Sequence, residues 1–252
     1  METKVYFVGA GPGDPGLITK KGKRLLNEAD VIIYAGSLVN PSLVEGLKAE
    51  LYNSAKMSLE EIIEVITEAV FQGKTVVRLH SGDPAFYGAI HEQIVELKAR
   101  GIAYKVIPGV TSASAGAASL GLEFTVPEVS QTVIFTRLGG KTPGPSSEDL
   151  IYFARKDVTL VIFLSINRAR EIEQALLKKL APDTPIALVY KASWPEEQII
   201  RGKLKDLSHL VKEAGFKKTA LIYVGEALEA AIKHMNKRSK LYRDSRLSEN
   251  FG

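Results

Sequence analysis

Short apolar runs alternate with amphipathic stretches along the first 120 residues of the chain. The apolar runs are bounded by turn residues, which is typical of buried parallel strands. They cover Val5–Val8, Val31–Tyr34, Thr75–Leu79 and Tyr104–Ile107. Helical periodicity is clearest over Leu59–Phe71, and Ser58 forms a capping box with Glu61 at the start of this helix. A further helix is predicted over Leu17–Glu28. Another is predicted after the third strand, with Ile90, Ile94 and Leu97 facing inward.

A second set of strands follows a break in the pattern near Gly121 and Pro127. These strands are predicted over Thr132–Thr136, Val158–Leu164, Ile186–Tyr190, Gln198–Arg201 and Thr219–Val224. The fourth follows the third too closely for a crossover helix, so we expect an antiparallel pair and a mixed sheet. The predicted fold is therefore α/β, with a largely parallel N-terminal domain (1–120), a mixed-sheet C-terminal domain (121–235) and a polar tail (236–252).

The amino-acid composition limits the kinds of chemistry that the chain can carry out. The 252 residues are 45% apolar and 25% charged, which is typical of a globular protein. The absence of cysteine excludes thiolate nucleophiles and Cys-based metal sites, and the four histidines lack ligand spacing, so we expect no metal site. No apolar run is long enough to span a bilayer or to form a signal peptide, which predicts a cytoplasmic protein. The net charge of +4 mildly favours acidic partners, either RNA or a polycarboxylate.

Ligands of parallel α/β sheets bind beyond the carboxyl ends of the strands, so the loops there are the candidates for chemistry. After the first strand, Gly11, Gly13 and Gly16 match the G-x-G-x-x-G pattern of dinucleotide sites. Pro12 and Pro15 remove two N–H donors from this loop, and no carboxylate follows the second strand. We therefore reject a dinucleotide site, and a rigid connecting turn is the alternative. A Walker loop is excluded because the required Lys is missing.

The loop after the third strand, residues 78–88, combines a flexible Gly82 with polar Asp83 and aromatic Phe86 and Tyr87. This set suits a ligand with polar and flat parts, although Asp83 could instead cap the following helix. The loop at 108–118 is rich in tiny residues, which fits either a ligand or close helix packing. The loop at 34–39 is the weakest signal. His80, at a strand end, is more typical of a structural residue.

Taken together, residues 8–19, 78–89 and 108–113 resemble, in order and spacing, the tetrapyrrole methylases of corrin and sirohaem biosynthesis. The segments Tyr-Ala-Gly-Ser-Leu-Val at 34–39 and Gln-Thr-Val-Ile-Phe-Thr-Arg at 131–137 resemble the precorrin-4 and cobalt-precorrin-4 C-11 methyltransferases. The resemblance implies two α/β domains, S-adenosylmethionine in a cleft between them, an anionic tetrapyrrole substrate and a homodimer. It implies no nucleic-acid or membrane partner.

The resemblance also implies roles for individual residues. Around the cofactor it places Pro12, Ser81, Gly82, Asp83, Phe86, Thr111, Ser112, Leu164, Ala187 and Ala220. At the substrate it places Ser37, Leu38 and Arg137, with Arg137 facing acetate or propionate groups. Tyr87 is the candidate catalytic residue, which either moves a proton or packs against the macrocycle.

Three alternatives stay open at this point. The same resemblance fits methylation at C-17, C-20 or C-2 and C-7 of the ring. A relative of diphthine synthase or of an rRNA methyltransferase would act on a macromolecule, and an RNA-directed enzyme would bind nucleic acid with a steep salt dependence. A nucleotide-binding module without catalysis is the least favoured.

Overall fold

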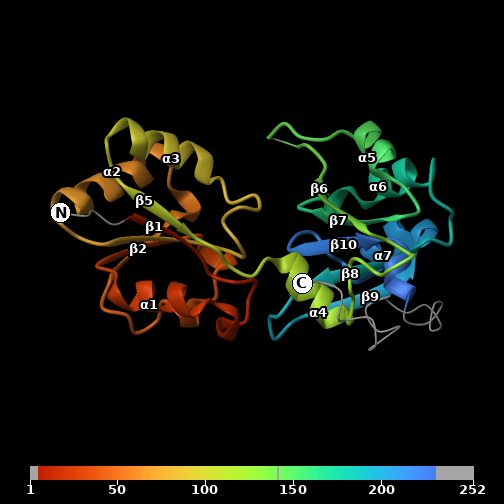
Figure 1. Ribbon diagram of the computed structural model, residues 1–252, viewed down its shortest axis with the longest axis horizontal. Helices are drawn as coiled ribbons and strands as arrows, with labels where there is room; N and C mark the ends of the chain where they lie inside the picture. The colour runs from red at the N-terminus through yellow and green to blue at the C-terminus, as the bar shows by residue number, and fades with distance from the viewer. Residues whose placement is uncertain (1–4, 141, 231–252) are drawn as a thin grey trace, which may run out of the picture. The chain divides into compact units, whose positions relative to one another are not determined.

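The computed structural model describes residues 5–140 and 142–230, which form two compact units (Figure 1). The first unit runs to Ala115 and also includes Ala192–Pro195. The second comprises Gly116–Lys191 and the described residues from Glu196 onward. The predicted polar tail at 236–252 lies outside the described residues. No helix in the described part of the chain is long and apolar enough to cross a membrane.

The first unit contains a parallel sheet of five strands in the order β3-β2-β4-β1-β5. The strands are β1 (Val5–Gly9), β2 (Val31–Tyr34), β3 (Glu50–Asn53), β4 (Val76–His80) and β5 (Tyr104–Ile107). The helices are α1 (Lys20–Glu28), α2 (Leu59–Phe71) and α3 (Ile90–Ala99). Figure 1 shows α1 on one face of the sheet and α2 and α3 on the other. Both faces are therefore covered, as the apolar runs predicted.

Two apolar cores cover the faces of this sheet. Val8 and Leu79 pack with Leu26 of α1, whereas Phe7 and Val76 belong to the core under α2 and α3. Alternate residues of one strand thus enter opposite cores, because side chains along a strand alternate between its faces. This arrangement brings the carboxyl ends of β4, β1 and β5 to one edge.

The structure confirms the predicted bounds of α2 and its Ser58–Glu61 capping box. The prediction of one helix over Leu17–Glu28 is wrong at its start. A 3₁₀ turn at Pro15–Leu17 comes first, and α1 begins after Thr19, whose hydroxyl accepts a bond from the amide of Gly22 at 3.0 Å. A Thr cap fixes the start of the helix at that point.

The second unit contains a mixed sheet in the order β6-β7-β10-β8-β9. Its strands are β6 (Thr132–Arg137), β7 (Val158–Phe163), β8 (Pro185–Tyr190), β9 (Gln198–Lys203) and β10 (Ala220–Val224). Its helices are α4 (Ser112–Leu120, which begins in the first unit), α5 (Ser147–Phe153), α6 (Ala169–Leu176) and α7 (Leu207–Ala214). β6 and β7 are parallel, and β8 pairs antiparallel with β9. The predicted mixed sheet is confirmed.

Tiny residues of α4 serve packing in the second unit. A Cβ built on Gly116 would overlap the hydroxyl of Tyr223, which is fully buried in β10. Only glycine fits there, so close packing explains the small residue at position 116. Burial also raises the pKa of the Tyr223 hydroxyl above its ordinary value.

Candidate active site

Three loops meet at the carboxyl edge of the first sheet, after the adjacent strands β4, β1 and β5. The amide of Gly82 donates to the carbonyl of Gly11 at 2.8 Å, and the amide of Gly11 donates back to Gly82 at 3.2 Å. A Cβ built on Gly9 or on Gly109 would collide with the Gly82 carbonyl oxygen. The loops therefore touch through their main chains, which only residues without a side chain permit.

Asp83 ties the second loop to the third. Its Oδ1 accepts a bond from the amide of Ala85 at 2.8 Å, and its Oδ2 accepts one from the amide of Gly109 at 2.9 Å. The alternative in which Asp83 caps the next helix is wrong, because α3 is preceded by Ala89 and has no side-chain cap. Each carboxylate oxygen has two lone pairs, so Asp83 can still accept bonds from a ligand.

Several polar backbone groups of the first loop form hydrogen bonds within the protein. The carbonyl of Pro12 accepts a bond from Trp194 Nε1 at 2.8 Å. The amide of Asp14 donates to Ser193 Oγ at 3.0 Å, and that of Gly16 donates to Asp14 Oδ1 at 2.7 Å. Its two prolines have no N–H at all. These bonds support the rejection of a phosphate cradle, which depends on N–H groups aimed at the ligand.

The predicted residues of the first unit gather on these loops. Built on Gly82, a Cβ would come no nearer than 3.8 Å to Thr111 or Ser112. Phe86 is 37% exposed and Tyr87 is 43% exposed. Tyr87 has a backbone φ of +56°, a value that is uncommon for bulky residues. The residues concerned are Pro12, Ser81, Gly82, Asp83, Phe86, Tyr87, Thr111 and Ser112.

The loop after β2 joins the same edge. Ser37 and Leu38 lie in a 3₁₀ turn at Gly36–Leu38, where both side chains are exposed. Asn40 Nδ2 donates to the carbonyl of Gly13 at 2.9 Å, which links this loop to the first one. The weakest of the four loop signals in the sequence thus belongs to the same cluster.

His80 lies behind these loops at the end of β4 and is 4% exposed. Burial, with a smaller contribution from nearby Arg78, lowers the pKa of His80 to about 3. The imidazole is therefore neutral near pH 7. Arg78 donates to Gln93 Oε1 and to the Ile33 carbonyl, both at 3.2 Å. This buried position agrees with the structural role that the sequence indicated.

In the second unit, Arg137 ends β6 and faces Phe163 of β7 in the strand register. Its Nη2 donates to the carbonyl of Pro143 at 2.8 Å and to that of Thr142 at 3.4 Å. Arg137 therefore shapes the Gly/Pro-rich loop 138–146 that it introduces, which the sequence did not indicate.

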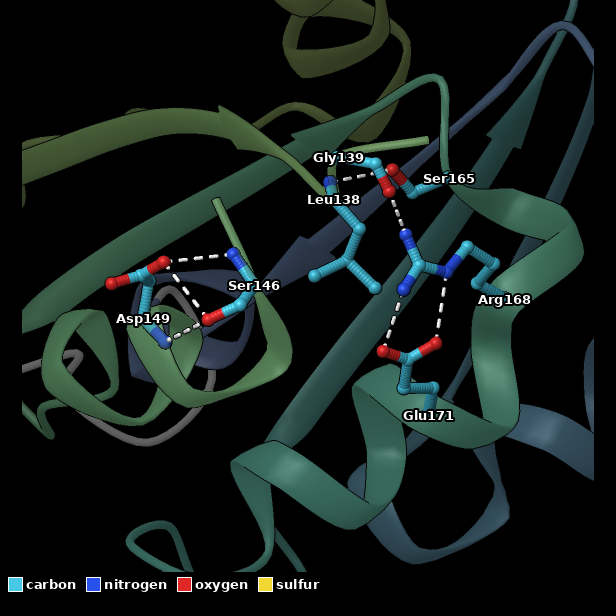
Figure 2. Close-up of polar contacts among 7 residues, drawn as sticks. All are labelled: Leu138, Gly139, Ser146, Asp149, Ser165, Arg168 and Glu171. Carbon is cyan, nitrogen blue, oxygen red and sulfur yellow. Dashed lines mark hydrogen bonds and ion pairs between the residues drawn. The ribbon is translucent and has the colours of Figure 1, made fainter. Parts of the chain in front are cut away.

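Figure 2 shows how the start of this loop is held. The amide of Leu138 donates to Ser165 Oγ at 2.9 Å, and Arg168 donates to the Gly139 carbonyl. Glu171 holds the guanidinium of Arg168 through two bonds, Nε to Oε2 at 2.8 Å and Nη2 to Oε1 at 2.6 Å. The i, i+3 spacing of this Arg–Glu pair is visible in the sequence, whereas its contact with Gly139 is not.

The remaining predicted residues differ in exposure. Leu164 follows β7 with a φ of +53° and is 68% exposed. Ala220 begins β10, an antiparallel neighbour of β7, so it lies at the edge where β7 ends. Ala187 lies within β8, opposite Tyr223, and is fully buried.

The chain matches the family model of the tetrapyrrole (corrin/porphyrin) methylases over residues 4–208. It belongs to this family. As a tetrapyrrole methylase, it is 57% identical to the cobalt-precorrin-4 C(11)-methyltransferase of Methanocaldococcus jannaschii over 228 residues, which are 89% of this chain and 88% of that protein. The predicted family and the prediction of a methyltransferase are confirmed.

Two solved structures share the fold of this methylase. The X-ray structure of a cobalamin biosynthetic enzyme, cobalt precorrin-4 methyltransferase, has a TM-score of 0.84 and 44% identity, covering 89% of this chain and 95% of that one. Uroporphyrin-III C-methyltransferase from Thermus thermophilus, complexed with S-adenosylhomocysteine, has a TM-score of 0.77 and 31% identity, covering 90% and 94%. The predicted architecture of two α/β units is confirmed.

Proposed function

We propose that this methylase transfers a methyl group from S-adenosylmethionine to carbon 11 of precorrin-4, or of its cobalt form, in cobalamin biosynthesis. The observation that carries the proposal is the loop cluster around Gly82 and Asp83, in a chain 57% identical to a protein named for this reaction. The same loop motifs carried the resemblance in the sequence.

The loops of the first unit fit the parts of S-adenosylmethionine. The hydroxyls of Ser81, Thr111 and Ser112 can donate to or accept from ribose and amino-acid groups. Phe86 offers exposed aromatic surface to a flat adenine. Gly82, at φ +64°, has room beside its backbone, since a built Cβ would meet other backbone atoms only at 3.8 Å or more, and a ligand can approach closely there. The cluster lacks a phosphate cradle, and this cofactor has no phosphate to bind.

The second group of proposed contacts serves the substrate. A tetrapyrrole of this class carries acetate and propionate groups, and guanidinium binds carboxylate with charge-assisted hydrogen bonds. We assign this role to Arg137, whose side chain is half-buried at the end of β6. Ser37 and the 51% exposed Leu38 are assigned to the ring. Leu164 and Ala220 are assigned to the cofactor from the edge where β7 ends, together with Ala187 within β8.

Bound S-adenosylmethionine supplies a methyl group already activated on a sulfonium sulfur, so the chain mainly has to align the reactants. Asp83 fixes the second and third loops to each other and accepts bonds from the cofactor. Tyr87 packs its exposed ring against the macrocycle, and proton transfer through its hydroxyl is the competing role. Tyr87→Phe separates the two, since packing predicts a turnover number within about twofold of wild type and proton transfer predicts a loss of about 100-fold.

The test is methyl transfer from S-adenosylmethionine labelled with ¹³C in the methyl group. Precorrin-4 and cobalt-precorrin-4 are supplied in separate reactions, and NMR locates the label in the product. The proposal predicts label at C-11 of at least one substrate. The substrate that reacts faster shows whether the preferred tetrapyrrole already contains cobalt. Label at C-17, C-20, C-2 or C-7 would assign the chain to another position of the ring.

We also propose a homodimer in the cytoplasm that binds no nucleic acid. The family resemblance and the cysteine-free composition support this part. Light scattering on the purified protein tests the dimer, and a single-chain mass in solution would contradict it. Nucleic-acid binding with a steep salt dependence would contradict the small-molecule assignment.

A further inference from the structure

We propose that Trp194 is a positioning residue for the first loop, residues 9–16, and thereby sets the affinity for the cofactor. The inference rests on the proposed function, because it takes this loop as part of the cofactor site. Trp194 lies in the connection between β8 and β9, yet it belongs with Ala192–Pro195 to the first unit. The chain thus returns to the first loop at a sequence separation of 182 positions, counted from Pro12 to Trp194.

Trp194 contacts the loop in two ways. Its indole Nε1 donates to the Pro12 carbonyl at 2.8 Å. Its ring also lies against Gly13 so closely that a Cβ built on Gly13 would overlap the indole. The loop therefore needs glycine at position 13, and the reason is this ring, not a phosphate.

These contacts fix the orientation of successive peptide groups. A peptide bond is planar, so a donor that holds the Pro12 carbonyl also sets the direction of the Gly13 N–H. Asn40 Nδ2 holds the next carbonyl, that of Gly13, at 2.9 Å. Two neighbouring peptide planes of the loop are thus held from outside it. A loop held in this way meets its ligand without further loss of conformational freedom.

The connection that carries Trp194 is shaped for this contact. Lys191 and Ser193 have φ values of +46° and +65°, a left-handed conformation that costs energy for residues with a side chain. Such strain persists only where the surroundings hold it. One holding contact is made by Ser193, whose Oγ accepts a bond from the amide of Asp14 at 3.0 Å.

The first test is Trp194→Phe, which keeps an aromatic ring and removes the N–H donor. Calorimetric titration with S-adenosylhomocysteine is expected to show binding about 3- to 10-fold weaker than wild type, the usual effect of losing one hydrogen bond. The melting temperature is expected to fall by no more than about 4 °C. The matched control is Tyr152→Phe, at an 80% exposed ring in α5, with unchanged affinity.

The second test approaches the same contact from the loop, with Gly13→Ala. The added methyl group displaces the indole, and Trp194 is the only tryptophan of the chain, so its fluorescence emission reports this directly. We expect a red-shifted emission together with weaker binding of S-adenosylhomocysteine.

The outcomes separate the two proposals. Wild-type protein that does not bind S-adenosylhomocysteine would overturn the proposed function, and this inference with it. Wild-type binding with unchanged affinity in Trp194→Phe, or with unchanged emission and affinity in Gly13→Ala, would overturn the positioning role alone.

Discussion

Two Gly/Pro-rich loops, one in each unit, follow parallel strands and look alike in sequence, yet they are held by different means. Loop 9–16 of the first unit is held by glycine contacts, backbone bonds and an indole. Loop 138–146 of the second unit also has a close glycine contact, between Gly139 and Gly144, and a backbone bond from Gly139 to Pro145. Its side-chain anchors, however, are guanidinium groups, since Arg168 bonds Gly139 and Arg137 bonds Pro143.

Under the proposed function, this difference lets two loops of similar composition serve different ligands. An anchor of neutral groups leaves no added charge near the first loop and suits the alignment of a small cofactor. An anchor of arginines brings positive charge to the second loop, where an anionic tetrapyrrole can use it. Arg168 is paired with Glu171, and Arg137 is the residue to which the proposed function assigns a substrate carboxylate.

The largest effect is expected from Gly109→Ala, which disrupts the close backbone contact between Gly109 and Gly82. Its methyl group would collide with the Gly82 carbonyl, which is backbone and cannot rotate away. We expect a loss of about 3 kcal/mol or more in the free energy of unfolding, measured with urea. In the control Gly140→Ala, a Cβ meets no atom within 4 Å, and a loss of comparable size there would contradict the explanation.

The next effect is the pH dependence of stability that His80, at the end of β4, is expected to cause. The pKa of His80 is about 3 in the folded protein and about 6.5 when the chain is unfolded. Between these values the unfolded state binds the proton more tightly, so stability falls as the pH drops. From pH 7 to pH 5 the wild type should lose about 2 kcal/mol more than His80→Gln. Equal losses in urea unfolding would show that His80 is not buried in its neutral form.

A smaller effect is expected from Arg168→Ala, which loosens only the second loop. The KM for the tetrapyrrole should rise about 10-fold, the effect of losing a charge-assisted bond that positions a binding loop. The affinity for S-adenosylhomocysteine should not change, and Arg168→Lys should restore part of the KM. The control is Arg155→Ala, which removes another bidentate arginine–carboxylate contact of the second unit, the contact between Arg155 and Asp157. A change in cofactor affinity with Arg168→Ala would break the contrast between the loops.

Much of the fold that presents these loops could be predicted from the sequence, because the fold follows local patterns. Apolar runs located the central strands, and parallel topology predicted that the loops after them would meet at one edge. The strand β3 (Glu50–Asn53) was missed because it is an edge strand with mostly exposed side chains and no apolar run. Short-range signals such as the capping box of α2 were sufficient for that helix.

The anchors themselves could not be predicted. Trp194 reaches Pro12 and Arg168 reaches Gly139 across 182 and 29 positions, and both act on backbone carbonyls. A carbonyl carries no sequence signal, since every residue has one. Asp83 was identified as polar and available, but its bond to Gly109 depends on how two loops meet.

The most direct test of the account is one calorimetric titration with S-adenosylhomocysteine, repeated on wild type, Asp83→Ala and Arg137→Ala. We predict about one ligand per chain for wild type, clearly weaker binding for Asp83→Ala and wild-type affinity for Arg137→Ala, whose defect should lie in the KM for the tetrapyrrole. Equal weakening in both variants, or a loss confined to Arg137→Ala, would contradict the division between a cofactor loop cluster and a substrate loop.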